Sequence, residues 1–157
     1  MSLESVKFFF KDNNLELSVI ETSEDTATVD SAALALGVEP NMIAKTMAFQ
    51  LKEKTILILS KGKARTDNKK FKETFKEKPK MLSLDLVEEI TGHPIGGVCP
   101  FGLKNSMEIY LDISLKEFET VYPAGGTPNS AVKITPDYLE KVTNGVWIDI
   151  SKDEVLD

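Results

Sequence analysis

Two apolar runs separated by three polar residues place the strongest constraint on the fold of this chain. Residues 43–51 and 55–60 both have the composition of β-strands, and the polar link Lys52-Glu53-Lys54 joins them. Strands joined by so short a link favour a hairpin-like pair. We therefore expect a sheet that is built around this pair.

Capping signals predict helices on both sides of the pair. Residues that can cap a helix start stand at Ser2, Thr28 or Asp30, Asp67, Ser83 and Thr135. Gly37 suits a left-handed helix end, and Pro136 suits a first helical position. Further short strands are expected near residues 17–20, 107–112, 120–124, 131–134 and 147–149. Helices and strand pairs intermix without a repeat, which predicts one α+β domain over residues 1–157 with a mixed sheet.

Composition excludes several classes of protein. The chain of 157 residues has one cysteine, Cys99, so no internal disulfide is possible and a reducing cytoplasm is expected. One histidine, His93, excludes a metal site with several histidines. The sequence contains no long apolar run, and residues 1–4 lack the pattern of a signal peptide, so no membrane association is expected.

Charge is distributed unevenly around a net value of −6. Residues 45–80 contain 12 Lys and Arg against 4 Asp and Glu, a local charge of +8, and the rest of the chain carries −14. Such a basic segment is either a solvated surface or a local phosphate-binding surface on an acidic body. The second interpretation suits a protein that holds one end of an RNA.

Three segments contain more glycine or more misplaced polarity than a packed core requires. In the first, Lys45 interrupts the apolar run of residues 43–49. It points either to solvent from a half-buried strand or into a cleft, where its ammonium would hold a carbonyl or phosphate oxygen. The second segment, residues 91–102, has four glycines and two prolines, and the third, residues 122–130, contains Gly125-Gly126. Either is a plain connector or a backbone surface that donates N–H groups to a ligand.

Cys99 and His93 lie six residues apart in the second segment. A thiolate nucleophile would need His93 within hydrogen-bond reach, but Val98 and Pro100 beside Cys99 suggest a small buried filler instead. The sequence has no carboxylate pair, metal-ligand spacing or Gly-x-Ser-x-Gly motif, which argues against a triad hydrolase or a metalloenzyme.

Four motifs in this order resemble the YbaK/EbsC family of aminoacyl-tRNA deacylases, whose relatives include the editing domain inserted in bacterial prolyl-tRNA synthetases. The motifs are TVDSAALALG at 28–37, IAKTMAF at 43–49, TGHPIGGVCPFG at 91–102 and VYPAGGTPNS at 121–130. The resemblance implies an α+β domain with a mixed, partly barrel-like sheet flanked by helices. It also implies hydrolysis of an amino acid wrongly attached to tRNA, without a cofactor or a metal.

The resemblance also assigns site residues. Lys45 matches the family's active-site lysine, and residues 96–100 match its GxxxP loop, with Gly97 at the position of close approach. The implied substrate-binding residues are Thr28, Thr46, Gly96, Pro100, Ala124, Gly125, Gly126 and Asn129. We expect Lys45 to hold the carbonyl region or the terminal adenosine, and the amides of Gly96 and Gly97 to polarise the ester.

The substrate and the partners stay open at this level. Alanine, serine, threonine and cysteine are all candidates, because Ala124 and Ala131 stand where members that act on cysteinyl-tRNA for proline often carry serine and aspartate. The expected partners are the acceptor end of tRNA, held by residues 45–80, and an aminoacyl-tRNA synthetase. The alternatives are a non-catalytic module that binds tRNA or a synthetase, and a cysteine-dependent hydrolase of a small molecule.

Overall fold

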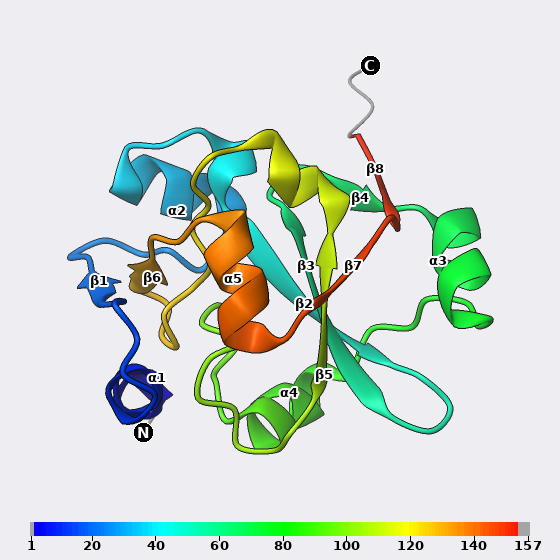
Figure 1. Cartoon of the computed structure of the whole chain (residues 1–157), viewed down its shortest axis with the longest axis horizontal. Helices are drawn as coiled ribbons and strands as arrows, with labels where there is room; N and C mark the ends of the chain where they lie inside the picture. Colours follow the sequence, from blue (N-terminus) through cyan, green and yellow to red (C-terminus); the bar gives the residue numbers. More distant parts are fainter. Residues whose placement is uncertain (1, 154–157) are drawn as a thin grey trace.

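A mixed four-stranded sheet lies at the centre of the computed structural model, which describes residues 2–153 (Figure 1). Its order is β2-β3-β5-β7, and its strands are β2 (Ala44–Gln50), β3 (Thr55–Lys61), β5 (Glu108–Asp112) and β7 (Val146–Ile148). The β2–β3 pair is antiparallel, and the β3–β5 and β5–β7 pairs are parallel. The expected α+β fold with a mixed sheet is confirmed. Within the described residues the sheet is open and closes no barrel, because β2 and β7 form its edges.

The apolar character of β3 follows from its central place between β2 and β5. Alternate side chains of a strand point to opposite faces of a sheet. Leu57 and Leu59 accordingly pack into one apolar cluster, and Ile56 and Ile58 pack into another on the opposite face. Both faces of the sheet are therefore covered.

The helices begin close to the capping residues that the sequence contains. They are α1 (Ser2–Asp12), α2 (Val29–Leu36), α3 (Asn68–Phe75), α4 (Leu84–Thr91) and α5 (Pro136–Thr143), with the 3-10 helices η1 (Pro40–Met42) and η2 (Ile113–Glu117). Side-chain oxygens of Thr28, Asp67 and Thr135 accept backbone N–H groups in the first turns of α2, α3 and α5. Ser83 precedes α4 without a side-chain capping bond, and Gly37 ends α2 with a φ of 69°.

Two small strand pairs flank the main sheet. They are β1 (Val19–Glu21) with β6 (Ser130–Val132), and β4 (Arg65–Thr66) with β8 (Ser151–Lys152). The prediction of a strand at residues 120–124 is wrong, since only isolated bridges form there, at Val121, Tyr122 and Ala124. Pro123 interrupts the segment because it has no N–H to donate to a continuous ladder.

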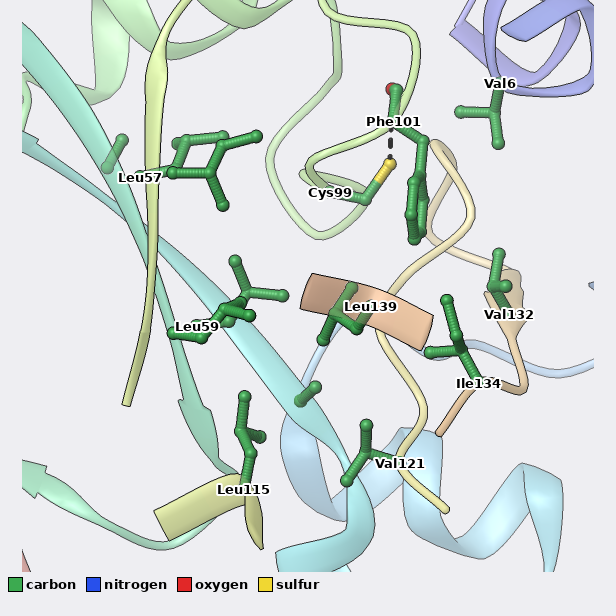
Figure 2. Packing of buried hydrophobic residues seen from close by; sticks show 14 of the residues in the cluster. Val6, Leu57, Leu59, Cys99, Phe101, Leu115, Val121, Val132, Ile134 and Leu139 are labelled. Carbon is green, nitrogen blue, oxygen red and sulfur yellow. Dashed lines mark hydrogen bonds between the residues drawn. The ribbon is translucent and has the colours of Figure 1, made fainter. Parts of the chain in front are cut away.

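Helices cover each face of the sheet with an apolar cluster. On one face α3 packs the ring of Phe71 against Phe49 and Phe75, at centroid distances of 5.0 and 4.7 Å. The opposite face carries the main core, to which α1, α4 and α5 contribute. Cys99 and Phe101 come from residues 91–102, the glycine-rich loop. Both lie in this core with Val6 and Leu139 (Figure 2). No helix among residues 2–153 has both the length and the apolar character that a membrane-spanning segment needs.

Candidate active site

A cavity of about 370 Å³ lies along the edge of β2 that faces away from β3. Helices α2 and α4 form apolar walls, and the loops around Ala27, Gly96 and Ala124 complete the lining. This volume suits a small ligand or one end of a larger one. Among the lining residues that the structure describes, Lys45 is the only charged one, and none is a carboxylate.

The edge of β2 is covered at both ends of the cavity and open between them. At one end the Ala44 N–H donates to the carbonyl oxygen of Tyr122 at 3.0 Å, and at the other the Leu82 N–H donates to the carbonyl oxygen of Ala48 at 2.9 Å. Thr46 lies midway between these two bonds and lines the cavity. Its Oγ1 is the single buried side-chain oxygen or nitrogen without a hydrogen-bond partner among residues 2–153. Thr46 therefore places an unsatisfied polar group in an apolar wall.

Lys45 lines the same cavity from the neighbouring position of β2. Its side chain is half-buried, and its ammonium donates to the carbonyl oxygen of Ala64, the residue before β4. An ammonium carries three N–H donors in a compact point charge, which suits an oxygen-rich ligand. The structure thus places the predicted lysine at the cavity wall.

The two adjacent glycines of the second segment have different surroundings. Gly96 lines the cavity with a φ of 89°, and no acceptor for its N–H exists among residues 2–153. Gly97 does not line the cavity, and its N–H donates to the carbonyl oxygen of Pro94 at 2.9 Å. A Cβ on Gly97 would lie 2.6 Å from the backbone nitrogen of Thr127. The Gly97 N–H therefore already has an acceptor within the chain, whereas the Gly96 N–H is a candidate donor. The role of either amide toward the ester stays a prediction.

The third segment contributes a wall and a turn. Tyr122, Ala124 and Ser130 line the cavity, whereas Gly125, Gly126 and Asn129 do not. The Ser130 Oγ accepts the Thr127 N–H at 3.1 Å, the Asn129 side chain donates to the carbonyl oxygen of Thr22 at 3.1 Å, and the carbonyl oxygen of Gly126 accepts the Ser2 hydroxyl. These contacts hold the turn in shape behind the wall that Ala124 presents.

Thr28 and Pro100 complete the predicted set. Thr28 lines the cavity, but its hydroxyl accepts the Ser31 N–H at 3.1 Å and donates to the Ser31 Oγ at 2.8 Å in a capping box. Pro100 is buried and lies outside the lining. The structure therefore brings Thr28, Lys45, Thr46, Gly96 and Ala124 together and leaves the other predicted residues around them.

The apolar walls were not predicted. They include residues of α2 and α4 and three exposed side chains at the cavity, Met81, Leu84 and Ile95, which are 55%, 69% and 56% exposed. From the sequence alone, an apolar residue is expected to lie in the core. Only the exposure of these side chains in the structure shows that they belong to the cavity wall.

Cys99 and His93 lie together in the main core, away from the cavity. The Sγ is 3.6 Å from the His93 Nε2, and both residues are 0% exposed. Burial raises the pKa of the thiol to about 12, and the carbonyl of Phe101 opposes this only in part. A buried protonated thiol is a poor nucleophile, which argues against a cysteine-dependent hydrolase. Residues 2–153 also contain no group of three or more His, Cys, Asp and Glu that could hold a metal ion.

Acidic partners neutralise part of the basic segment. The ion pairs are Lys54–Glu108, Lys61–Glu117, Lys61–Asp153, Lys63–Asp30 and Lys70–Asp149. Burial opposes the charged form of Lys61, yet the hydrogen bonds that its ammonium donates to Asp153 and Glu117 raise its pKa above the ordinary value. The exposed side chains of Arg65, Lys78 and Lys80 lie close in sequence to the cavity, since Arg65 follows Ala64 and Lys80 precedes Met81.

Comparisons with known proteins agree with this geometry. The family model of the aminoacyl-tRNA editing domain matches residues 23–142. The uncharacterized protein YwhH of Bacillus subtilis is 48% identical over 98% of this chain and 99% of its own length. EbsC of Enterococcus faecalis, named as a candidate Cys-tRNA(Pro)/Cys-tRNA(Cys) deacylase, is 29% identical over 84% of this chain and 82% of its own. The solved structure of a candidate trans-editing enzyme for prolyl-tRNA synthetase superposes with a TM-score of 0.89 at 31% identity, and covers 96% of this chain and 97% of its own.

Proposed function

Because the chain belongs to the aminoacyl-tRNA editing domain family, we propose that it is a trans-editing enzyme that hydrolyses the ester bond of a mischarged aminoacyl-tRNA. The observation that carries the proposal is the apolar cavity at the edge of β2, whose lining within residues 2–153 includes one cation, Lys45, and no carboxylate. Water adds to the ester carbonyl carbon, the bond from this carbon to the ribose oxygen breaks, and the ribose oxygen takes a proton. The products are free tRNA and the amino acid.

An aminoacyl ester is already activated, so its hydrolysis depends on positioning and on stabilising the negative charge at the carbonyl oxygen. Lys45 holds the carbonyl region or the terminal adenosine through its ammonium, and the Gly96 N–H faces the reacting group. The attacking group is water or a group of the substrate itself. The reaction as proposed consumes no cofactor, because water is its second reactant.

The cavity favours an uncharged side chain, because its walls are apolar. Ala32, Ala124 and Ala131 line it with methyl groups, and Thr28 closes it beside α2. One methylene in such a pocket changes the discrimination between substrates by about 1–3 kcal/mol. Alanine, serine, threonine and cysteine therefore remain the candidate amino acids.

The acceptor end of tRNA is the proposed macromolecular partner, and an aminoacyl-tRNA synthetase is the proposed second one. We assign the reaction to the cytoplasm, where charged tRNA is used. Arg65, Lys78 and Lys80 of the basic segment are exposed and take part in no ion pair within residues 2–153. We assign these three side chains to the phosphates next to the cavity.

A deacylation screen tests the proposal. The wild-type protein is mixed with alanyl-, seryl-, threonyl- and cysteinyl-tRNA, each on its cognate tRNA and on proline tRNA, and the release of amino acid is followed. We expect rapid turnover of at least one substrate and about a 100-fold loss of kcat/KM in Lys45→Ala. The matched control is Lys141→Ala, since Lys141 is exposed on α5, away from the cavity.

The screen also separates the alternative function. Turnover that persists in a folded Lys45→Ala protein would remove the lysine from the mechanism. Release from no substrate, with salt-sensitive tRNA binding intact, would support a non-catalytic binding module instead.

A further inference from the structure

The open stretch of β2 has a fixed hydrogen-bonding direction. In an antiparallel pair, the backbone groups of alternate residues point to the neighbouring strand and away from it. The N–H groups of Ala44 and Gln50 and the carbonyl of Ala48 bond to segments on the side away from β3. Thr46 has the same parity in the strand, so its N–H and C=O also point away from β3, along the cavity.

These two backbone groups lack partners. Within residues 2–153 the outward N–H and C=O of Thr46 have no hydrogen bond to another segment, and the Thr46 Oγ1 is buried and unsatisfied. Native structures rarely leave backbone and side-chain groups of one residue unsatisfied together. Since the three groups face a cavity that holds one charged residue, they indicate a ligand that brings its own donor and acceptor.

An aminoacyl ester has a donor and an acceptor in the required arrangement. Its α-amine and its carbonyl are separated by one carbon, as they are in a residue of a β-strand. We propose, resting on the function above, that the aminoacyl group pairs with Thr46 as a one-residue antiparallel strand. The amine donates to the Thr46 C=O, and the Thr46 N–H donates to the ester carbonyl oxygen.

The antiparallel direction orients the substrate. Antiparallel chains run in opposite directions. The ester end of the aminoacyl group therefore lies toward Lys45, and its amine end lies toward Met47. The Thr46 N–H then stabilises the negative charge that develops on the ester carbonyl oxygen. The Gly97 N–H cannot do so while it donates to the carbonyl oxygen of Pro94.

The open stretch of β2 between Ala44 and Ala48 is short, and its length restricts the class of substrate. The Leu82 N–H already occupies the Ala48 carbonyl at the amine end, so a group attached to the amine would extend into a filled position. The site therefore accepts aminoacyl groups with a free α-amine and excludes N-acylated ones.

The first experiment compares the best substrate of the screen with the same aminoacyl-tRNA after N-acetylation. We expect kcat/KM to fall by a factor of ten or more on acetylation. A smaller change would overturn the pairing while leaving the deacylase function intact. Absence of turnover for every aminoacyl-tRNA would overturn the proposed function and this inference with it.

A second experiment removes the N–H alone. Two variants with the same side chain are compared. Thr46→Val keeps the N–H of residue 46, and the second variant carries 2-hydroxy-3-methylbutanoic acid at this position, so that an ester oxygen replaces the N–H. We expect the ester variant to lose kcat by a factor of ten or more relative to Thr46→Val while both proteins stay folded at the assay temperature. Equal kcat values for the two variants would exclude the Thr46 N–H as the donor.

Discussion

The Sγ of Cys99 lies 3.6 Å from the Nε2 of His93, and both residues are 0% exposed. Figure 2 shows Cys99 within the main core. The pair has the residue types of a thiol nucleophile and its base. Its place in the core, outside the cavity lining, gives it a structural role instead.

Cys99→Ser is therefore expected to keep the deacylase activity within about threefold, because the thiol contacts no substrate. The buried hydroxyl that it introduces reduces the free energy of unfolding by about 1–3 kcal/mol. Since burial raises the pKa of the thiol to about 12, iodoacetamide at pH 8 should label the native protein slowly and the urea-unfolded protein rapidly. Fast labelling of the native protein, or loss of turnover in the folded variant, would contradict this assignment.

His93 makes stability depend on pH near neutrality. Burial lowers its pKa below the ordinary value, against a hydrogen bond to the carbonyl of Phe101. The unfolded chain therefore binds a proton at His93 more readily than the folded chain does. The contribution of neutral His93 to the free energy of unfolding is fully present above the unfolded pKa of about 6.5 and is lost as the pH falls below it. Urea unfolding between pH 7.5 and 5.5 should show this loss, with a slope of at most about 1.4 kcal/mol per pH unit. His93 is the only histidine, so His93→Gln should flatten the profile in this range.

Gly97 tests the packing of the glycine-rich loop. A Cβ at this position would meet the backbone of Gly126 and Thr127 at 2.6–2.7 Å, so Gly97→Ala forces the two loops apart. We expect a loss of about 1–3 kcal/mol in unfolding free energy, together with a lower kcat/KM. Gly37→Ala is the control, because a Cβ there meets nothing within 4 Å and only the φ of 69° opposes it. An undiminished stability of Gly97→Ala would show that the loops do not pack as described.

Local signals predicted much of this fold. Thr28, Asp67 and Thr135 cap helices because their side chains bond within one turn, and a contact of that range can be read from adjacent residues. The strand expected at 120–124 is reduced to isolated bridges, since Pro123 has no N–H to continue the ladder.

The site was predictable in its motifs but not in its contacts. Lys45, Thr46 and Gly96 line one cavity, and their roles toward a substrate stay predictions, whereas the N–H of Gly97 donates to the carbonyl oxygen of Pro94. The sequence could not show which lysines of the basic segment have acidic partners, because Asp149 and Glu117 approach Lys70 and Lys61 only in the folded chain. Such pairings depend on tertiary structure, which local patterns do not contain.

Asp112 joins the end of β5 to the C-terminal segment. Its buried carboxylate accepts the Ile150 N–H at 2.8 Å, the Ser114 N–H at 3.0 Å and the Ser151 hydroxyl at 2.6 Å. Asp112→Ala leaves these donors unsatisfied and should reduce the free energy of unfolding by about 3 kcal/mol or more. Asp12→Ala, at an exposed position of α1, should change it by less than about 0.5 kcal/mol. Similar urea midpoints for the two variants would refute the role of Asp112.

The proposed RNA contacts predict a distinct salt dependence. Each phosphate contact contributes about 0.9 to the slope of log K against log salt for duplex nucleic acid, and about 0.7 for a single strand. Arg65→Ala and Lys80→Ala should each weaken binding of deacylated tRNA and reduce this slope by a little less than one. Lys54→Ala provides the comparison, because Lys54 is ion-paired with Glu108 at 2.7 Å and should leave the slope unchanged. If all three variants bind tRNA with the wild-type slope, the exposed cations of residues 65–80 are a solvated surface, and the substrate is held by the cavity alone.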